Sequence, residues 1–351
     1  MPVSPTERSK RRWSEPRLRK FDAVWLQGPV PAGYWDSRDN RRGYLCWLGQ
    51  KHGFRWYEDW YRITTDDLKH NRGGGLLAHY WNSSVVYGVQ DAFPEYDWKE
   101  WLFKSCPREF WDRRGNHRRY MKWLGQQLGI RRCPGWYRVT NRDFTRHKGG
   151  AFLLHYNSTI SAAVMANFPH YDWKDWLFRK IPKGLWNSRE NRRRYLEWLG
   201  QKLGITELDG WYAVTREQIE ANHGSNLLKM FSGSPYLLVK DAYPEHDWKE
   251  WMFARVPLGF WRKQENRRRY LKWLGRRLGY RRARDWYRVR KEDFTQHYGG
   301  GLVASVHSYL NLLQEEFPHL DWSPDTVRLR QQRRGRVRNS HPVGTTLGFE
   351  G

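Results

Sequence analysis

Apolar side chains recur along this chain with the spacing of short helices. Between residues 195 and 203 the apolar positions are Tyr195, Leu196, Trp198, Leu199 and Leu203. These positions fall on one face of a helix, which predicts that this face packs into a core. Gly204 follows directly, and glycine commonly ends a helix in the left-handed conformation. We therefore predict a helix that ends at Gly204.

The residues that follow predict further short elements. Residues 211–214 are expected to form an extended link, and Thr215 and Gln218 have the spacing of a capping box that opens a second helix. A turn that contains glycine comes next, and a further helix is expected to end before Pro244. Residues 247–253 are expected to form a last short helix or turn. The same capping spacing occurs at Thr64 and Asp67 and at Thr140 and Asp143.

Tryptophan repeats along the chain, and its leading position recurs at intervals of 76, 75 and 75 residues. The sets are Trp35, Trp111, Trp186 and Trp261; Trp47, Trp123, Trp198 and Trp273; Trp60, Trp136, Trp211 and Trp286; Trp98, Trp173, Trp248 and Trp322; and Trp101, Trp176 and Trp251. They contain nineteen of the 23 tryptophans, so chance does not explain the period. The fifth set has no member in the last copy. Self-similarity at a fixed period predicts an array of stacked units.

The predicted fold is all-α, an array of four tandem tryptophan-rich repeats with about four short helices each. The predicted repeats are residues 34–109, 110–184, 185–259 and 260–322. Residues 1–33 and 323–351 are predicted to be disordered basic termini, because they can bury little apolar surface.

One motif, Asn-Arg-Arg-Arg-Tyr-Leu-x-Trp-Leu-Gly, opens the predicted repeats. It occupies residues 191–200 and 266–275, and weaker copies occupy 40–49 and 116–125. Arginine in a first helical turn opposes the helix dipole, so its recurrence needs a reason. One reason is phosphate binding by guanidinium and backbone N–H groups. The other is an ion pair with an acid of the same helix, such as Glu190, or with the acidic second half of a neighbouring repeat.

Charge separates the predicted repeats. The chain carries a net charge of +26 and has a pI of about 10.1, which favours a polyanionic partner, with nucleic acid first. The second and fourth repeats carry +11 and +7, whereas the first and third are neutral. Drift of surface charge among duplicated units would also give an asymmetry. We interpret the second and fourth repeats as the principal phosphate contacts.

The predicted nucleic-acid contacts are arginines of the motif and of the turns that follow it. They are Arg118, Arg119, Arg131, Arg132, Arg193, Arg194, Arg268, Arg269, Arg276, Arg277, Arg281 and Arg282.

Other recurring residues have two readings each. The tryptophans of the repeated sets are expected in the core, while Trp56 and Trp81, outside the sets, are the candidates for base stacking. Asn40, Asn116, Asn191 and Asn266 are expected to cap the first helices, or else to bond bases or phosphates. The glycine runs, such as 73–75, are expected to form tight turns, or to let the backbone approach a phosphate. No P-loop sequence follows any of them.

Enzymatic signals are weak. Cysteine and histidine show no zinc spacing, and the equivalent His147 and His297 are replaced by Asn71 and Asn222 in the other copies. Aspartates beside tryptophans are expected to cap turns. We therefore expect neither an active site nor a cofactor. The three cysteines lack paired spacing and favour an intracellular protein with reduced thiols.

The sequence thus predicts a non-enzymatic protein that binds nucleic acid, with DNA slightly favoured over RNA. The alternatives are a scaffold for acidic proteins or a subunit of a ribonucleoprotein. No apolar run is long enough to cross a membrane, and no secretory signal is expected. The nucleus is the favoured location, with a mitochondrion or another organelle as the alternative, because the basic N-terminal arm can be read as a presequence, a localisation signal or a nucleic-acid-binding arm.

Overall fold

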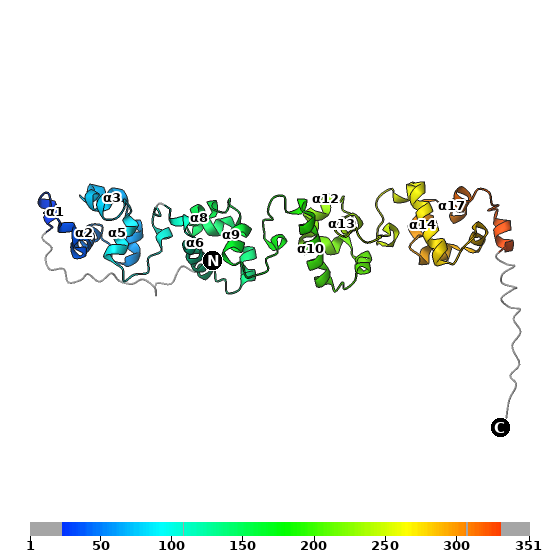
Figure 1. Cartoon of the computed structure of the whole chain (residues 1–351), viewed down its shortest axis with the longest axis horizontal. Coiled ribbons are helices and arrows are strands. Elements are labelled where there is room, and N and C mark those ends of the chain that lie inside the picture. Colours follow the sequence, from blue (N-terminus) through cyan, green and yellow to red (C-terminus); the bar gives the residue numbers. More distant parts are fainter. Residues whose placement is uncertain (1–22, 108, 307, 331–351) are drawn as a thin grey trace, which may run out of the picture. The chain divides into compact units, whose positions relative to one another are not determined.

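The computed structural model describes residues 23–330 except 108 and 307. These residues form helices joined by turns and contain no strand (Figure 1), which confirms the predicted all-α class. The chain divides into two compact units, with the boundary between Lys183 and Gly184. The predicted disorder of residues 1–22 and 331–351 concerns segments outside the described residues.

The first unit contains short helices around two longer ones, α2 and α6. In order, its elements are α1 (Val24–Gln27), η2 (Tyr34–Asp36), α2 (Arg38–Lys51), η3 (Tyr57–Arg62), α3 (Thr65–His70), α4 (Gly74–His79), α5 (Val85–Ala92), η4 (Glu100–Leu102), η5 (Phe110–Asp112), α6 (Arg114–Gln127), η6 (Cys133–Arg138), α7 (Asn141–Arg146), α8 (Gly150–Leu154), α9 (Ile160–Asn167) and η7 (Asp175–Leu177). The label η marks 3-10 helices.

The second unit has the same kind of order around α10 and α14. Its elements are η8 (Leu185–Asn187), α10 (Arg189–Leu203), η9 (Leu208–Ala213), α11 (Arg216–Ile219), the π-helical turn η10 (Glu220–Gly224), α12 (Ser225–Met230), α13 (Pro235–Ala242), η11 (Glu250–Met252), η12 (Phe260–Arg262), α14 (Gln264–Arg277), η13 (Ala283–Arg288), α15 (Lys291–Gln296), α16 (Gly300–Ser305) and α17 (Tyr309–Glu316).

Local signals placed several helix ends correctly. Gly204 ends α10 in the left-handed conformation with φ 73°. The Thr215 hydroxyl accepts a hydrogen bond from the Gln218 backbone N–H, and the predicted capping box is confirmed. The predicted extended link at residues 211–214 is wrong. Residues 208–213 form a 3-10 helix, and only Val214 is extended.

The asparagines of the motif do not cap the first helices, so that prediction is wrong. The N-cap of α10 is Ser188, whose hydroxyl accepts a hydrogen bond from the Asn191 backbone N–H. The Asn191 side chain instead donates to the carbonyl of Leu185 at 3.0 Å. It thereby fastens the long helix to the 3-10 helix before it. The same bond recurs at Asn40, Asn116 and Asn266.

The tyrosine of each long helix explains the glycine runs. Tyr120 on α6 is fully buried and its hydroxyl donates to the carbonyl of His147 in the turn between α7 and α8. A Cβ on Gly149 would overlap that hydroxyl. Glycine is therefore required where the turn passes over the tyrosine. This contact supports the tight-turn reading of the glycine run.

Replacing Gly149 by alanine is expected to destabilise the first unit by about 1–3 kcal/mol, because the added methyl group must push Tyr120 or the turn aside. Denaturant unfolding measures the change. Gly150→Ala is the matched control, since no atom lies within 4 Å of its added Cβ. Equal losses for the two variants would contradict the steric explanation.

Most tryptophans of the repeated sets lie in the core, as predicted, and the set on the long helices lies at its edge. Trp60 and Trp136 are buried, whereas Trp47 and Trp123 are half-buried and pack against the core from outside. The large aromatic clusters therefore combine fully buried rings with rings that seal the border of the core.

Trp101 packs against the residues that follow it. Its ring lies 5.5 Å from Tyr120 and 5.4 Å from Trp123, between ring centroids. Trp251 has the same relation to Tyr270 and Trp273, at 5.5 and 5.6 Å. Trp101 and Trp251, which end predicted repeats, therefore belong to the cores of the segments that follow them.

Trp25 stands in the same relation to α2 and extends the fifth set to the first segment. It lies in α1, is buried, and its ring is 5.6 Å from Tyr44 and 5.8 Å from Trp47. The prediction of a disordered arm up to residue 33 is therefore wrong for residues 23–33. The basic residues of the predicted arm all lie before residue 23, and the buried ring of Trp25 ties the apolar stretch that follows them to α2.

The predicted start of the disordered C-terminal tail, at residue 323, is also too early. Residues 324–330 are helical, Val327 is buried in the core of the last segment, and the Arg330 guanidinium lies 4.6 Å from the centre of the Tyr287 ring. The prediction of disorder is wrong for residues 323–330, because Val327 supplies an apolar anchor within a polar stretch.

Candidate functional site

Arginines at the first of the three arginine positions of the motif form hydrogen bonds and ion pairs that stabilise the fold. Arg192 on α10 bonds the Asp241 carboxylate at 2.7 Å and the Trp186 carbonyl at 2.8 Å. Arg41 makes the same bonds to Asp91 and Trp35. These guanidinium groups join the long helix to α13 or α5 and to the preceding 3-10 helix, so they are not offered to a ligand.

His117 takes this position on α6. It is buried, and its ring nitrogens contact the Trp111 carbonyl and, at 2.6 Å, the Tyr156 hydroxyl. Burial lowers the pKa of His117 below its ordinary value. Protonation is therefore easier in the unfolded chain than in the folded one.

The stability of the first unit is expected to fall as the pH drops below about 6.5, because the unfolded state then binds the proton that folded His117 resists. Unfolding at pH 7.5 and at pH 5.5 measures the effect. His117→Gln keeps a polar side chain that does not titrate, and it should flatten this part of the pH dependence. An unchanged slope in the variant would show that another group is responsible.

The arginine at the second of these positions pairs with a glutamate in every segment except that of α6. Arg42 bonds Glu95 at 2.7 Å, Arg193 lies 3.0 Å from Glu245, and Arg268 bonds Glu316 at 2.6 Å. Arg118 is exposed, and no described residue forms a hydrogen bond or ion pair with it.

At the third arginine position, two of the predicted nucleic-acid contacts form ion pairs within the fold instead. Arg119 lies 3.0 Å from Glu100, and Arg269 bonds both oxygens of Glu250 at 3.1 Å. Both glutamates are buried, and the hydrogen bond with Glu250 raises the pKa of Arg269. Each pair fastens the Trp101 or Trp251 segment to the next long helix.

Seven of the predicted arginines do come together, in two similar grooves. The Arg131 groove, about 460 Å³, is lined by Arg118, Met121, Lys122, Gly125, Gln126, Ile130, Arg131, Arg132, Cys133, Trp136, Asn167 and Phe168. The Arg281 groove, about 510 Å³, is lined by Arg268, Leu271, Lys272, Gly275, Arg276, Tyr280, Arg281, Arg282, Ala283, Trp286, Glu316 and Phe317.

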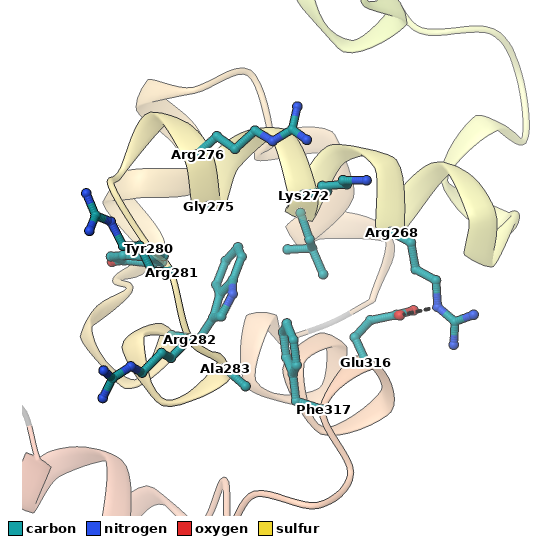
Figure 2. Close-up of a pocket in the computed structure, with 12 residues that line it drawn as sticks. Arg268, Lys272, Gly275, Arg276, Tyr280, Arg281, Arg282, Ala283, Glu316 and Phe317 are labelled. Atoms are coloured by element: carbon teal, nitrogen blue, oxygen red, sulfur yellow. Dashed lines mark hydrogen bonds and ion pairs between the residues drawn. The ribbon is translucent and has the colours of Figure 1, made fainter.

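Each groove lies between a long helix and the turn that follows it. In the Arg281 groove, Arg268, Lys272 and Arg276 lie at spacings of four residues on one face of α14 (Figure 2). Arg281 and Arg282 belong to the turn before η13, on the other side of the groove, and their guanidinium groups extend away from α14 (Figure 2). Phe317, just after α17, also lines the groove. The floor is apolar, since Trp286 and Leu271 are buried.

The equivalent positions of the other two segments hold no arginine pair. After α2, Arg55 and Trp56 stand at these positions, and Trp56 is half-buried. After α10, Thr206 and Glu207 stand where the second and fourth segments have paired arginines. The basic grooves thus belong to the second and fourth segments, which carry the high net charge.

The two grooves differ in the acids near them. The Asp285 carboxylate accepts hydrogen bonds from the backbone N–H groups of Arg281 and Arg282 at 3.0 Å. Gly135 takes the place of this aspartate beside Arg131 and Arg132. A second recess, of about 500 Å³, opens there and includes Arg138. The Arg131 groove has four basic side chains and no carboxylate in its lining, whereas the Arg281 groove has five basic side chains and one carboxylate, so the two linings carry the same net charge.

Sequence reasoning missed several groove residues and included some arginines that lie elsewhere. Lys122 and Lys272 were missed, although their spacing of four residues from Arg118 and Arg268 was a usable signal. The aromatic ends, Phe168 and Phe317, carried no such signal. The predicted contacts outside the groove linings are Arg119, Arg193, Arg194, Arg269 and Arg277.

The proposed stacking platform at Trp81 is wrong. Trp81 is buried and its indole N–H donates to Asp91 at 3.2 Å, because Gly88 on α5 lets the ring pack flat against the helix. Trp56 is half-buried. Aromatic surface next to basic charge is instead found in the two grooves.

Within residues 23–330, with the two gaps noted above, no group of three or more histidine, cysteine or acidic side chains could hold a metal ion. No helix in the same part of the chain is long and apolar enough to cross a membrane. Comparisons with models of protein families, with curated proteins and with solved structures give no match.

Proposed function

We propose that this protein binds nucleic acid without acting as an enzyme, with DNA favoured over RNA, and that the Arg131 and Arg281 grooves hold the phosphate backbone. The observation that carries the proposal is the free arginine and lysine side chains of the Arg131 groove, which has no acid in its lining. Clustered guanidinium groups bind phosphate oxygens through charge-assisted hydrogen bonds. The chain charge of +26 would add long-range attraction.

We further propose that the grooves belong to a tandem array of four helical repeats. The recurring contacts of Trp25, Trp101 and Trp251 with the long helices support this array and a start of each repeat at the tryptophan. Two basic copies would then alternate with two neutral ones. Two linked sites on one strand gain affinity through their effective concentration.

Purification with and without nuclease tests the proposal. Nucleic acid that copurifies should raise the absorbance at 260 nm relative to 280 nm, and its digestion by deoxyribonuclease or ribonuclease identifies its type. Binding to naked nucleic acid should weaken steeply with salt, because bound phosphates release counterions. No measurable affinity at physiological salt would reject the proposal and favour a scaffold for acidic proteins or a ribonucleoprotein subunit.

A further inference from the structure

The Arg281 groove contains one acid, Glu316, at the end of α17. Its side chain is only 4% exposed, and its Oε2 accepts a hydrogen bond from the Arg268 Nε at 2.6 Å (Figure 2). Its other oxygen, Oε1, is buried and has no hydrogen-bond partner among the described residues. A buried carboxylate oxygen without a donor costs free energy, and a ligand that donates a hydrogen bond to it would recover that cost.

An aromatic ring lies directly beside this acid. Phe317 is half-buried, lines the groove and lies 5.6 Å from Trp286, between ring centroids. An accessible ring of this kind can stack on a nucleobase. Lys272, Arg276 and Arg281 line the same groove and can neutralise the phosphates on either side of such a base.

We propose that the Arg281 groove binds a nucleobase with an exocyclic amino group, presented by a single strand. The base stacks on Phe317, its amino group donates to Glu316 Oε1, and the flanking phosphates contact the surrounding basic side chains. Glutamate is a suitable acceptor for the amino group of cytosine. This inference rests on the proposed nucleic-acid binding and adds a base preference to it.

The Arg131 groove lacks the same feature. Asn167 takes the place of Glu316, and its Nδ2 donates to the Tyr156 hydroxyl at 3.0 Å and to the Ala163 carbonyl at 2.8 Å. No carboxylate lines this groove. It is therefore expected to contact the phosphate backbone without the same base preference.

Fluorescence anisotropy with labelled oligo-dC and oligo-dT of equal length tests the inference on the full chain. Cytosine offers an amino group where thymine offers a carbonyl oxygen. The wild-type protein is expected to bind oligo-dC roughly tenfold more tightly. Glu316→Gln should bring the two affinities close together, because an amide can face either base. Using the ratio removes the general effect of the lost negative charge.

Glu315→Gln is the matched control, since Glu315 lies next in sequence, is half exposed and pairs with Arg267 outside the groove. It should leave the ratio unchanged. Phe317→Leu should weaken binding of both oligonucleotides about tenfold through lost stacking. Thermal melts verify that each variant is folded, and the Phe317 variant keeps the inference testable if the Glu316 variant unfolds.

Two results would overturn the inference. One is equal binding of oligo-dC and oligo-dT by the wild-type protein, and the other is an unchanged ratio in Glu316→Gln. Equal binding by the wild-type protein together with tighter binding of both oligonucleotides by that variant would make Glu316 a simple neutraliser of Arg268. In each case nucleic-acid binding itself would stand. Failure to bind either oligonucleotide would instead reject the proposed function.

Discussion

Replacing Arg118, Arg131 and Arg132 by alanine is expected to lower the affinity for nucleic acid by at least about tenfold at physiological salt. These side chains line the Arg131 groove, which has no acid of its own. If each contacts one phosphate, the slope of log K against log salt should become shallower by about 2 to 3. Titrations at several salt concentrations measure both quantities.

The matched control removes the same charge from Arg42, Arg193 and Arg216. Each of these pairs with a glutamate, at 2.7, 3.0 and 2.8 Å. They are therefore expected to contribute little, and most of the affinity and the salt slope should remain. If the control loses as much as the groove variant, net charge rather than the groove would determine binding.

Replacing Trp25 by alanine is expected to destabilise the first core of the chain by about 3–5 kcal/mol, because it empties a buried site between α1 and α2. Hydrogen exchange of the α2 amides is a suitable measurement, since tandem units need not unfold as one. The loss of protection should be largest in α2 and its neighbours.

Truncations separate Trp25 from the residues before it. Deleting residues 1–22 should preserve the protection of α2, whereas deleting residues 1–33 should reproduce the loss caused by Trp25→Ala. Equal protection in both truncated proteins would show that α1 is dispensable and that the first core is complete without Trp25.

Local sequence predicted the helix ends well. Thr140 and Asp143 form their capping box because both groups lie within one turn of the same backbone. Gly204 ends α10 because glycine adopts a positive φ without a steric penalty. The cap predicted at Asn191 lies three residues too late. Ser188 caps α10, and the Asn191 amide donates to the Leu185 carbonyl instead.

The sequence by itself determined the all-α class, the recurring tryptophan core and the concentration of charge in two segments, because these depend on residue type, helical period and counting. Tertiary structure decided which charges are free. Arg119 and Arg118 are adjacent in sequence, yet Glu100 holds only Arg119. Glu316 lies 48 positions from Arg268 in the sequence, yet the two side chains form a hydrogen bond. Ion pairs depend on distances between side chains that only packing brings together, so the grooves could not be found from the motif alone.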